Sequence, residues 1–212
     1  MISRSTGLIA SALLGALSPS LAPAAAPQPL APRCASGPEA ALVRAAFAKP
    51  APPAPFAAAQ QLELPEAVVV SALPAEQAYG VAASHFQAIW ESLQAWESSV
   101  FVVMKGGHVF EVYGKLFHGE PSKRSNFFNL HGEGAGMSGH LRPDLLSAIY
   151  VISIPGKEAP MRGVLFYDQA GEAAFGVYVP GEGSTPSESL IKAFEATAAE
   201  IRSLPAVCER SD

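Results

Sequence analysis

The segment VFVVMKGGHVFEVYG, residues 100–114, permits few local structures. Apolar residues dominate both halves, and the Gly-Gly pair between them supplies the positive φ angles of a tight hairpin turn. We therefore expect two antiparallel strands joined at Gly106-Gly107, with Met104 opposite Val109 and Val102 opposite Glu111.

Strand alternation sorts the side chains of this hairpin onto two faces. One face is wholly apolar and we assign it to the core: Phe101, Val103, Phe110 and Val112. The other face is apolar with polar exceptions, as in a wall that faces a ligand: Val100, Val102, Met104, Val109, Glu111 and Tyr113.

The rest of the chain predicts an α+β fold. Short helices interrupted by prolines occupy residues 38–74, and an amphipathic helix follows Ser84, its expected N-cap, with five apolar residues at helical spacing: Phe86, Ile89, Trp90, Leu93 and Trp96. Further strands are expected at 126–130, 147–154, 163–168 and 173–179, and a closing helix at 187–204. This order indicates an antiparallel sheet with N-terminal helices and a C-terminal helix.

The first residues resemble a secretory signal. Arg4 is the only charge before Pro32, an apolar run covers residues 7–17, and Ala22 and Ala24 offer a cleavage site. The run is too short to span a bilayer. We expect a leader at 1–38, a folded domain at 39–205 and a tail at 206–212. The leader slightly favours export to the periplasm, and the alternative is a disordered extension.

The two cysteines leave an open question, because Cys34 and Cys208 lie near opposite ends of the chain. They could pair in an oxidising compartment, or they could be two unpaired thiols in poorly ordered tails. Their spacing matches no zinc or redox motif.

Charge and motifs exclude several classes of function. The net charge is −5 without a long basic run, which argues against nucleic-acid binding. No phosphate loop, nucleotide fingerprint or nucleophile elbow is present, and the carboxylates are scattered. We therefore assign no catalytic residue.

The histidines near the glycine-rich stretch FFNLHGEGAGMSGHLRPD, residues 127–144, are the candidate ligands. A zinc trio of His118, His131 and His140 has spacings unlike those of usual zinc sites. His140 follows Gly139 and precedes a strand-like segment, where a neutral imidazole can coordinate a metal centre or serve as a hydrogen-bonded structural residue.

The same stretch, followed by AIYVISIP and GVLFYDQAGEAAFGVYV, resembles the haem-utilisation carrier family of ChuX/HutX type, which is related to HemS-like haem proteins. The resemblance covers residues 40–200, and its most specific parts are the F-F-N-L and S-G-H-L motifs. It implies a soluble α+β protein that binds one haem per subunit, often forms a homodimer and passes haem to downstream proteins in the cytoplasm. His140 would be the iron ligand, with Met137 among the residues around the haem.

One departure from the family concerns the second iron ligand. Where the family commonly has a His before the hairpin, this chain has Met104. A thioether can ligate haem iron opposite a His. Alternatively, Met104 only packs, and the sixth position is open, holds water or is taken by Tyr113. The segment after the last strand also lacks the expected basic residue, so propionate binding falls to Lys123, Arg124 or Arg142.

The resemblance therefore predicts a haem carrier rather than a catalyst. Two alternatives stay open: a haem-degrading enzyme of HemS-like type, and an interaction module that keeps the fold but no longer binds haem.

Overall fold

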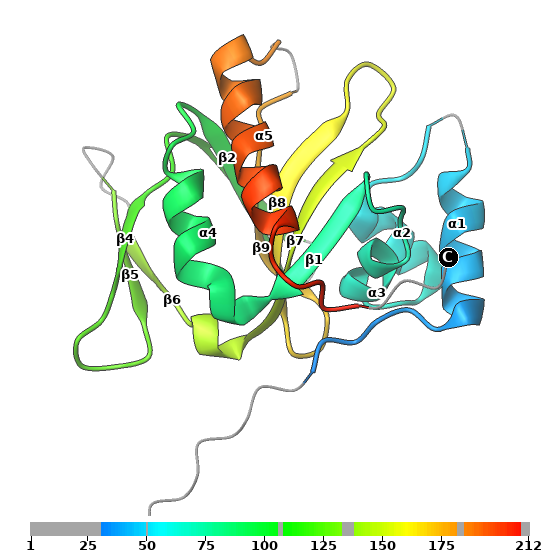
Figure 1. Cartoon of the computed structure of the whole chain (residues 1–212), viewed down its shortest axis with the longest axis horizontal. Coiled ribbons are helices and arrows are strands. Elements are labelled where there is room, and N and C mark those ends of the chain that lie inside the picture. Colours follow the sequence, from blue (N-terminus) through cyan, green and yellow to red (C-terminus); the bar gives the residue numbers. More distant parts are fainter. Residues whose placement is uncertain (1–30, 50, 106–107, 133–137, 182–184, 209–212) are drawn as a thin grey trace, which may run out of the picture.

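The computed structural model describes residues 31–49, 51–105, 108–132, 138–181 and 185–208. It consists of two antiparallel sheets and two groups of helices (Figure 1). The expected α+β class with antiparallel strands and a closing helix is confirmed. The order differs in one respect, because the strand Ala78–Ala82, which was not expected, precedes the helix Phe86–Leu93.

The large sheet has six strands in the order β1-β7-β8-β9-β2-β3, all paired antiparallel. Their bounds are Ala78–Ala82 for β1, Ser99–Lys105 for β2, His108–Gly114 for β3, Leu146–Ile154 for β7, Met161–Asp168 for β8 and Ala173–Tyr178 for β9. Met104 pairs with Val109, and Val102 pairs with Glu111, as expected. The turn at Gly106-Gly107 lies outside the described residues.

Helices cover both faces of this sheet (Figure 1). On one face, α1 (Gly37–Phe47), α2 (Pro55–Leu62) and α3 (Glu66–Ser71) pack against Tyr150, Ile152 and Leu165. On the other face lie α4 (Phe86–Leu93) and α5 (Glu188–Arg202), whose apolar side chains meet Ile149, Val164 and Phe166. The large sheet therefore has one apolar core on each of its two faces.

The start of α4 differs from the expectation. Ser84 lies inside a 3₁₀ turn, η1 (Ala83–His85), and His85 occupies the N-cap position without a side-chain cap. The five apolar residues predicted on the buried stripe are all buried. The periodicity thus located the buried face, whereas the cap depended on a turn that the sequence did not reveal.

The expected apolar face of the hairpin is only partly in the core. Phe101 is buried, and Val103 and Val112 pack against the core, but Phe110 is 63% exposed. The assignment of Phe110 to the core is therefore wrong. The reason is that β3 is the last strand of the sheet, and Phe110 lies near the hairpin tip.

A second sheet of three short strands, β4 (His118–Pro121), β5 (Phe128–His131) and β6 (Ser138–Leu141), lies beside α4 (Figure 1). A second 3₁₀ turn, η2 (Pro143–Leu145), connects it to β7. Phe128 and Leu130 are buried, and Leu141 packs against the same core as α4 and α5. Only β5 was expected from the sequence.

The two ends of the described part of the chain are joined by a disulfide between Cys34 and Cys208. The alternative of two unpaired thiols in disordered tails is therefore wrong for these residues. Beside the bond, Val207 N donates to Gly80 O at 3.0 Å, and Ala206 forms a bridge with Val81. Within the described ranges, no helix has the length and apolar character needed to cross a bilayer.

Candidate functional site

The small sheet presents a polar outer face. Phe128 and Leu130 point inward, so alternation along β5 turns Asn129 and His131 outward. Pairing with β4 and β6 extends this face in two rows across the sheet. The rows are His118–His131–Ser138 and Glu120–Asn129–His140.

His140 is exposed on this face, and its orientation is fixed by one neighbour. Its Nδ1 lies 2.9 Å from Oδ1 of Asn129, the residue opposite it on β5. An amide oxygen can only accept a hydrogen bond, so Nδ1 carries the proton. The lone pair of a neutral imidazole is then on Nε2, which is the arrangement of a histidine that ligates a metal.

Phe127 lies beside this imidazole, and Arg142 lies over the Phe127 ring. The ring of Phe127 lies 5.6 Å from the ring of His140, and the guanidinium carbon of Arg142 lies 5.4 Å from the Phe127 centroid. Arg142 is engaged by Asp144, to which Nε and Nη2 donate at 2.7 and 2.6 Å. These bonds hold the pKa of Asp144 below its usual range. Slight burial opposes this shift, and a hydrogen bond from Asn126 adds to it.

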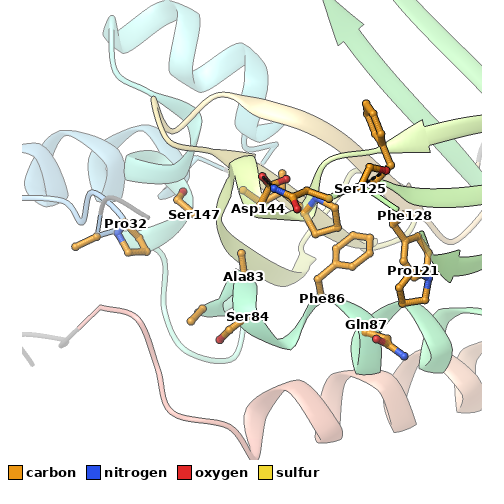
Figure 2. Close-up of a pocket in the computed structure, with 16 residues that line it drawn as sticks. Pro32, Ala83, Ser84, Phe86, Gln87, Pro121, Ser125, Phe128, Asp144 and Ser147 are labelled. Carbon is orange, nitrogen blue, oxygen red and sulfur yellow. Dashed lines mark hydrogen bonds between the residues drawn. The ribbon is translucent and has the colours of Figure 1, made fainter. Parts of the chain in front are cut away.

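An apolar cavity of about 640 Å³ lies on the other side of Phe127. Figure 2 shows Phe86, Phe128 and Pro121 grouped along one part of it, and the Phe86 and Phe128 rings meet edge to face at 5.0 Å. Its volume falls within the range of small-molecule pockets. Phe127 therefore connects His140 to an apolar pocket.

Met104 is not brought near His140. Alternation along β2 places it opposite to Phe101, on the face of the large sheet that α2 and α3 cover. There it lines a cavity of about 800 Å³ with Phe56 and Glu66. His140 lies in the small sheet, on the opposite side of the large sheet (Figure 1). The two residues cannot flank one iron within a single subunit.

The other expected haem contacts are scattered. Tyr113 is 63% exposed on β3, and its hydroxyl donates to Glu111 Oε2 at 2.8 Å. Lys123 and Arg124 are exposed between β4 and β5. Met137 lies outside the described residues. Among the expected residues that the structure describes, Arg142 is linked to His140 through the Phe127 ring.

The three histidines that were considered for zinc lie in two different rows of the small sheet. His118 and His131 face each other with ring centroids 6.5 Å apart, and His131 Nε2 lies 3.6 Å from Glu120 Oε1. His140 belongs to the next row. Across the described parts of the chain, no group of three or more His, Cys, Asp or Glu side chains is arranged to hold a metal ion.

Asn129 and Phe127 are the neighbours of His140 that reasoning from the sequence did not single out. Both lie in the F-F-N-L motif, and the alternation of Phe128 and Leu130 indicates that Asn129 faces outward. Its contact with His140 depends on the register between β5 and β6.

Comparison with known proteins identifies the family. The family model described as "Haem utilisation ChuX/HutX" matches residues 80–197, which include β2 to β9 and most of α5. The chain belongs to the ChuX/HutX family. One relative is the intracellular heme transport protein HutX of Vibrio cholerae, 34% identical over 127 residues. The match covers 59% of this chain and 64% of the relative, less than two thirds of its length.

Solved structures share the fold of this ChuX/HutX chain. The crystal structure of ChuX superposes with a TM-score of 0.67 at 23% identity, covering 76% of this chain and 98% of ChuX. The E. coli heme oxygenase ChuS gives a TM-score of 0.57 at 17% identity, covering 67% of this chain and 43% of ChuS. At these identities the likeness concerns the fold alone.

The expectation of export is contradicted by this comparison. The Vibrio cholerae relative is, by its name, an intracellular protein. The apolar N-terminal run that suggested a secretory signal belongs to residues 1–30, which lie outside the described residues.

Proposed function

We propose that this ChuX/HutX-family chain binds one haem per subunit and carries it between proteins inside the cell. In this proposal His140 is an iron ligand through Nε2. The observation that carries the proposal is the hydrogen bond between His140 Nδ1 and Asn129 Oδ1, which leaves Nε2 as the lone-pair nitrogen of an exposed imidazole. When bound, haem would supply an iron centre that accepts this nitrogen.

The surroundings of His140 fit a flat apolar cofactor that must also be released. Phe127 offers an aromatic surface beside the imidazole, and Arg142 supplies a cation next to it. Arg142 already forms an ion pair with Asp144, so we assign it only a secondary contribution to binding a haem propionate. Lys123 and Arg124 are the other cations that could bind a propionate. An exposed ligand suits a carrier, since an acceptor protein can reach it.

The homodimer is a further part of the proposal. The outermost strand, β3, exposes Val109, Phe110 and Tyr113, and an apolar edge strand favours pairing with another chain. Met104 lies on the adjacent strand. Met104 could therefore serve as the second iron ligand only if it came from a second subunit. Tyr113, on the exposed edge strand, is the alternative second ligand.

A haemin titration tests the ligand assignment. We expect a saturable Soret band for the parent chain, and for His140→Ala an affinity at least about tenfold lower with a shifted band, because a coordinate bond is lost. Asn129→Leu should weaken binding by about tenfold, since the residue that orients a ligating His matters nearly as much as the ligand. Glu195→Ala, at an exposed residue of α5 outside the small sheet and the β3 edge, is the control. Unchanged affinity and spectrum in His140→Ala would refute the assignment.

The same sample separates the remaining alternatives. Under ascorbate and oxygen, a carrier should keep its Soret band, whereas loss of the band with formation of a bilin would indicate a haem-degrading enzyme. If haemin showed no saturable binding, the chain would be an interaction module that retains the fold.

A further inference from the structure

We propose that His118 and His131 form a surface site for a divalent transition cation, with Cu²⁺ as the ion that binds most tightly. The two residues are register partners, His118 on β4 and His131 on β5, and both belong to the outer face of the small sheet. The protein supplies two ligands, and water fills the remaining positions of the ion. This site is independent of haem.

The two rings already lie at a separation that one ion can bridge. Their centroids are 6.5 Å apart, and their planes are inclined by 30°. With metal–nitrogen bonds of about 2.0 Å, two imidazoles on one ion have ring centres roughly 4.5–6.5 Å apart, from neighbouring to opposite positions. The observed separation is at the upper end of this range. A small rotation of the two exposed side chains is therefore sufficient for both to reach one ion.

The backbone beneath the pair is held in place by the core. Trp90 Nε1 donates to the carbonyl oxygen of Phe117, the residue before His118, at 3.3 Å. Leu130, the residue before His131, is 5% exposed and belongs to the same core as Trp90. The strand pairing and these contacts fix the two backbone positions, so only the rings have to move when an ion binds.

Both histidines line one cavity of about 540 Å³, which lies between the end of α4, the β3–β4 connection and the small sheet. Both are exposed, so a hydrated ion can reach them from solvent. A neutral imidazole carries one lone pair and is a ligand that Cu, Ni and Zn share.

Two neighbouring charges act on a cation at the pair in opposite directions. Glu120 Oε1 lies 3.6 Å from His131 Nε2, longer than a hydrogen bond, and its negative charge favours a cation. Lys115 lines the same cavity, and its ammonium group disfavours a cation. The net charge of −5 on the whole chain adds to the attraction. Removing each of the two local charges should therefore change the affinity with opposite sign.

A pair of imidazoles also selects the kind of ion. Structural zinc sites use four protein ligands and catalytic ones three, and in the described part of the chain no group of three or more His, Cys, Asp or Glu could hold an ion. Cu²⁺ and Ni²⁺ accept tetragonal sets of nitrogen and oxygen ligands, and Cu²⁺ binds most tightly in the first-row series. Ca²⁺ and Mg²⁺ prefer oxygen ligands. Cu²⁺ is therefore the appropriate probe.

Isothermal titration of Cu²⁺ into the haem-free full chain tests the site. We expect saturable binding, and an affinity at least about tenfold lower in both His118→Ala and His131→Ala, because the second imidazole is no longer supplied by the same molecule. Electron paramagnetic resonance of the copper-loaded protein should show two coordinated nitrogens in the parent and one in each variant. His108→Ala, at an exposed histidine on β3, is the control and should bind as the parent does. Equal affinities and spectra in all four proteins would overturn the proposal.

The charge variants separate coordination from general attraction to an acidic chain. Glu120→Gln should weaken Cu²⁺ binding about threefold, and Lys115→Ala should strengthen it by about the same factor. An excess of Ca²⁺ should leave Cu²⁺ bound, because Ca²⁺ does not bind imidazole nitrogen. If Ca²⁺ displaced Cu²⁺ at equal concentration, charge alone would hold the ion, and the site would be refuted.

A further variant distinguishes the pair from the candidate haem ligand. His131 pairs with Ser138, which is two residues, or about 7 Å, from His140 along β6. His140→Ala should therefore bind Cu²⁺ as the parent does. Loss of Cu²⁺ binding in His140→Ala with unchanged binding in His118→Ala would place the ion at His140 and overturn the proposal. All histidine variants should melt at the temperature of the parent, since each substituted side chain is exposed.

Discussion

Glu66 begins α3 with its carboxyl group buried, only 4% of the residue being exposed. The hydroxyl of Tyr167 donates to Oε1 at 3.1 Å, and no ion pair to Glu66 is found in the described part of the chain. Burial raises the pKa of Glu66 to about 7, with a smaller contribution from the charge of Glu172, while the Tyr167 hydrogen bond opposes the rise. This residue therefore makes stability depend on pH.

The direction follows from proton binding in the two states. The unfolded chain releases this proton near pH 4.5, and the folded chain keeps it until about pH 7. The free energy of unfolding should therefore fall as the pH rises through this window, by roughly 3 kcal/mol at most. Glu66→Gln keeps an acceptor for Tyr167 and should remove this loss of stability. The free energies of unfolding measured by urea denaturation at pH 5 and pH 8 should therefore differ less in this variant than in the parent. Exposed Glu195→Gln is the control, and an unchanged pH dependence in Glu66→Gln would contradict the argument.

Reasoning from the sequence identified some residues of the candidate site and missed others. His140 could be selected from its motif, and the structure places it on an exposed face with one ring nitrogen engaged. Asn129 could not be selected, because it is eleven residues from His140 in the chain and meets it only through the pairing of β5 with β6. Met104 was placed in the correct register, but the register does not say which side of the sheet the other ligand occupies.

Among the secondary-structure elements, the small sheet was the least predictable. The alternation in residues 100–114 extends over two seven-residue strands and was sufficient to fix their pairing. In contrast, β4 is four residues long and reads His-Gly-Glu-Pro, with no apolar alternation and with residues that are depleted in strands. Its strand conformation comes from pairing with β5 and from packing against α4.

At Gly119, β4 packs closely against Phe128 of β5 and Trp90 of α4. A Cβ at this residue would lie 2.0 Å from Cε1 of Phe128 and 2.8 Å from Nε1 of Trp90. The Phe128 ring cannot move freely, because Phe86 and Trp90 contact it at centroid distances of 5.0 and 5.8 Å. Gly119→Ala should therefore lower the free energy of unfolding by about 1–3 kcal/mol, as measured by chemical denaturation.

Gly139 on β6 is a matched control for this prediction. A Cβ there would lie 3.8 Å from the nearest atom, Cδ1 of Leu130, which is an ordinary contact on the same inner face. Gly139→Ala should change the free energy of unfolding by no more than about 0.5 kcal/mol. Equal effects of the two substitutions would show that backbone flexibility, and not the approach of β4 to α4, determines the outcome.

At the scale of the whole molecule, the Cys34–Cys208 bond closes nearly the entire described chain into one loop, with a sequence separation of 174. The spacing of Cys34 and Cys208 in the sequence matches no zinc or redox motif, so their pairing becomes evident only in the folded structure. Inside a cell, where the related HutX acts, thiols are mostly kept reduced. Under reducing conditions the fold would rely on its two apolar cores, which lie on the two faces of the large sheet.

This reasoning predicts a large effect on stability and a small effect on haem binding. In oxidised protein, Cys34→Ser should lower the free energy of unfolding by up to about 5 kcal/mol, because a long loop is no longer closed in the unfolded state. With a reducing agent, the parent and Cys34→Ser should melt together. The haemin titration should match for the parent and Cys34→Ser, oxidised and reduced, since the pairing of β5 with β6, and not the disulfide, holds Asn129 beside His140. If reduction abolished haemin binding while the fold persisted, the joined ends would have to shape the haem site, and the small sheet alone would not suffice.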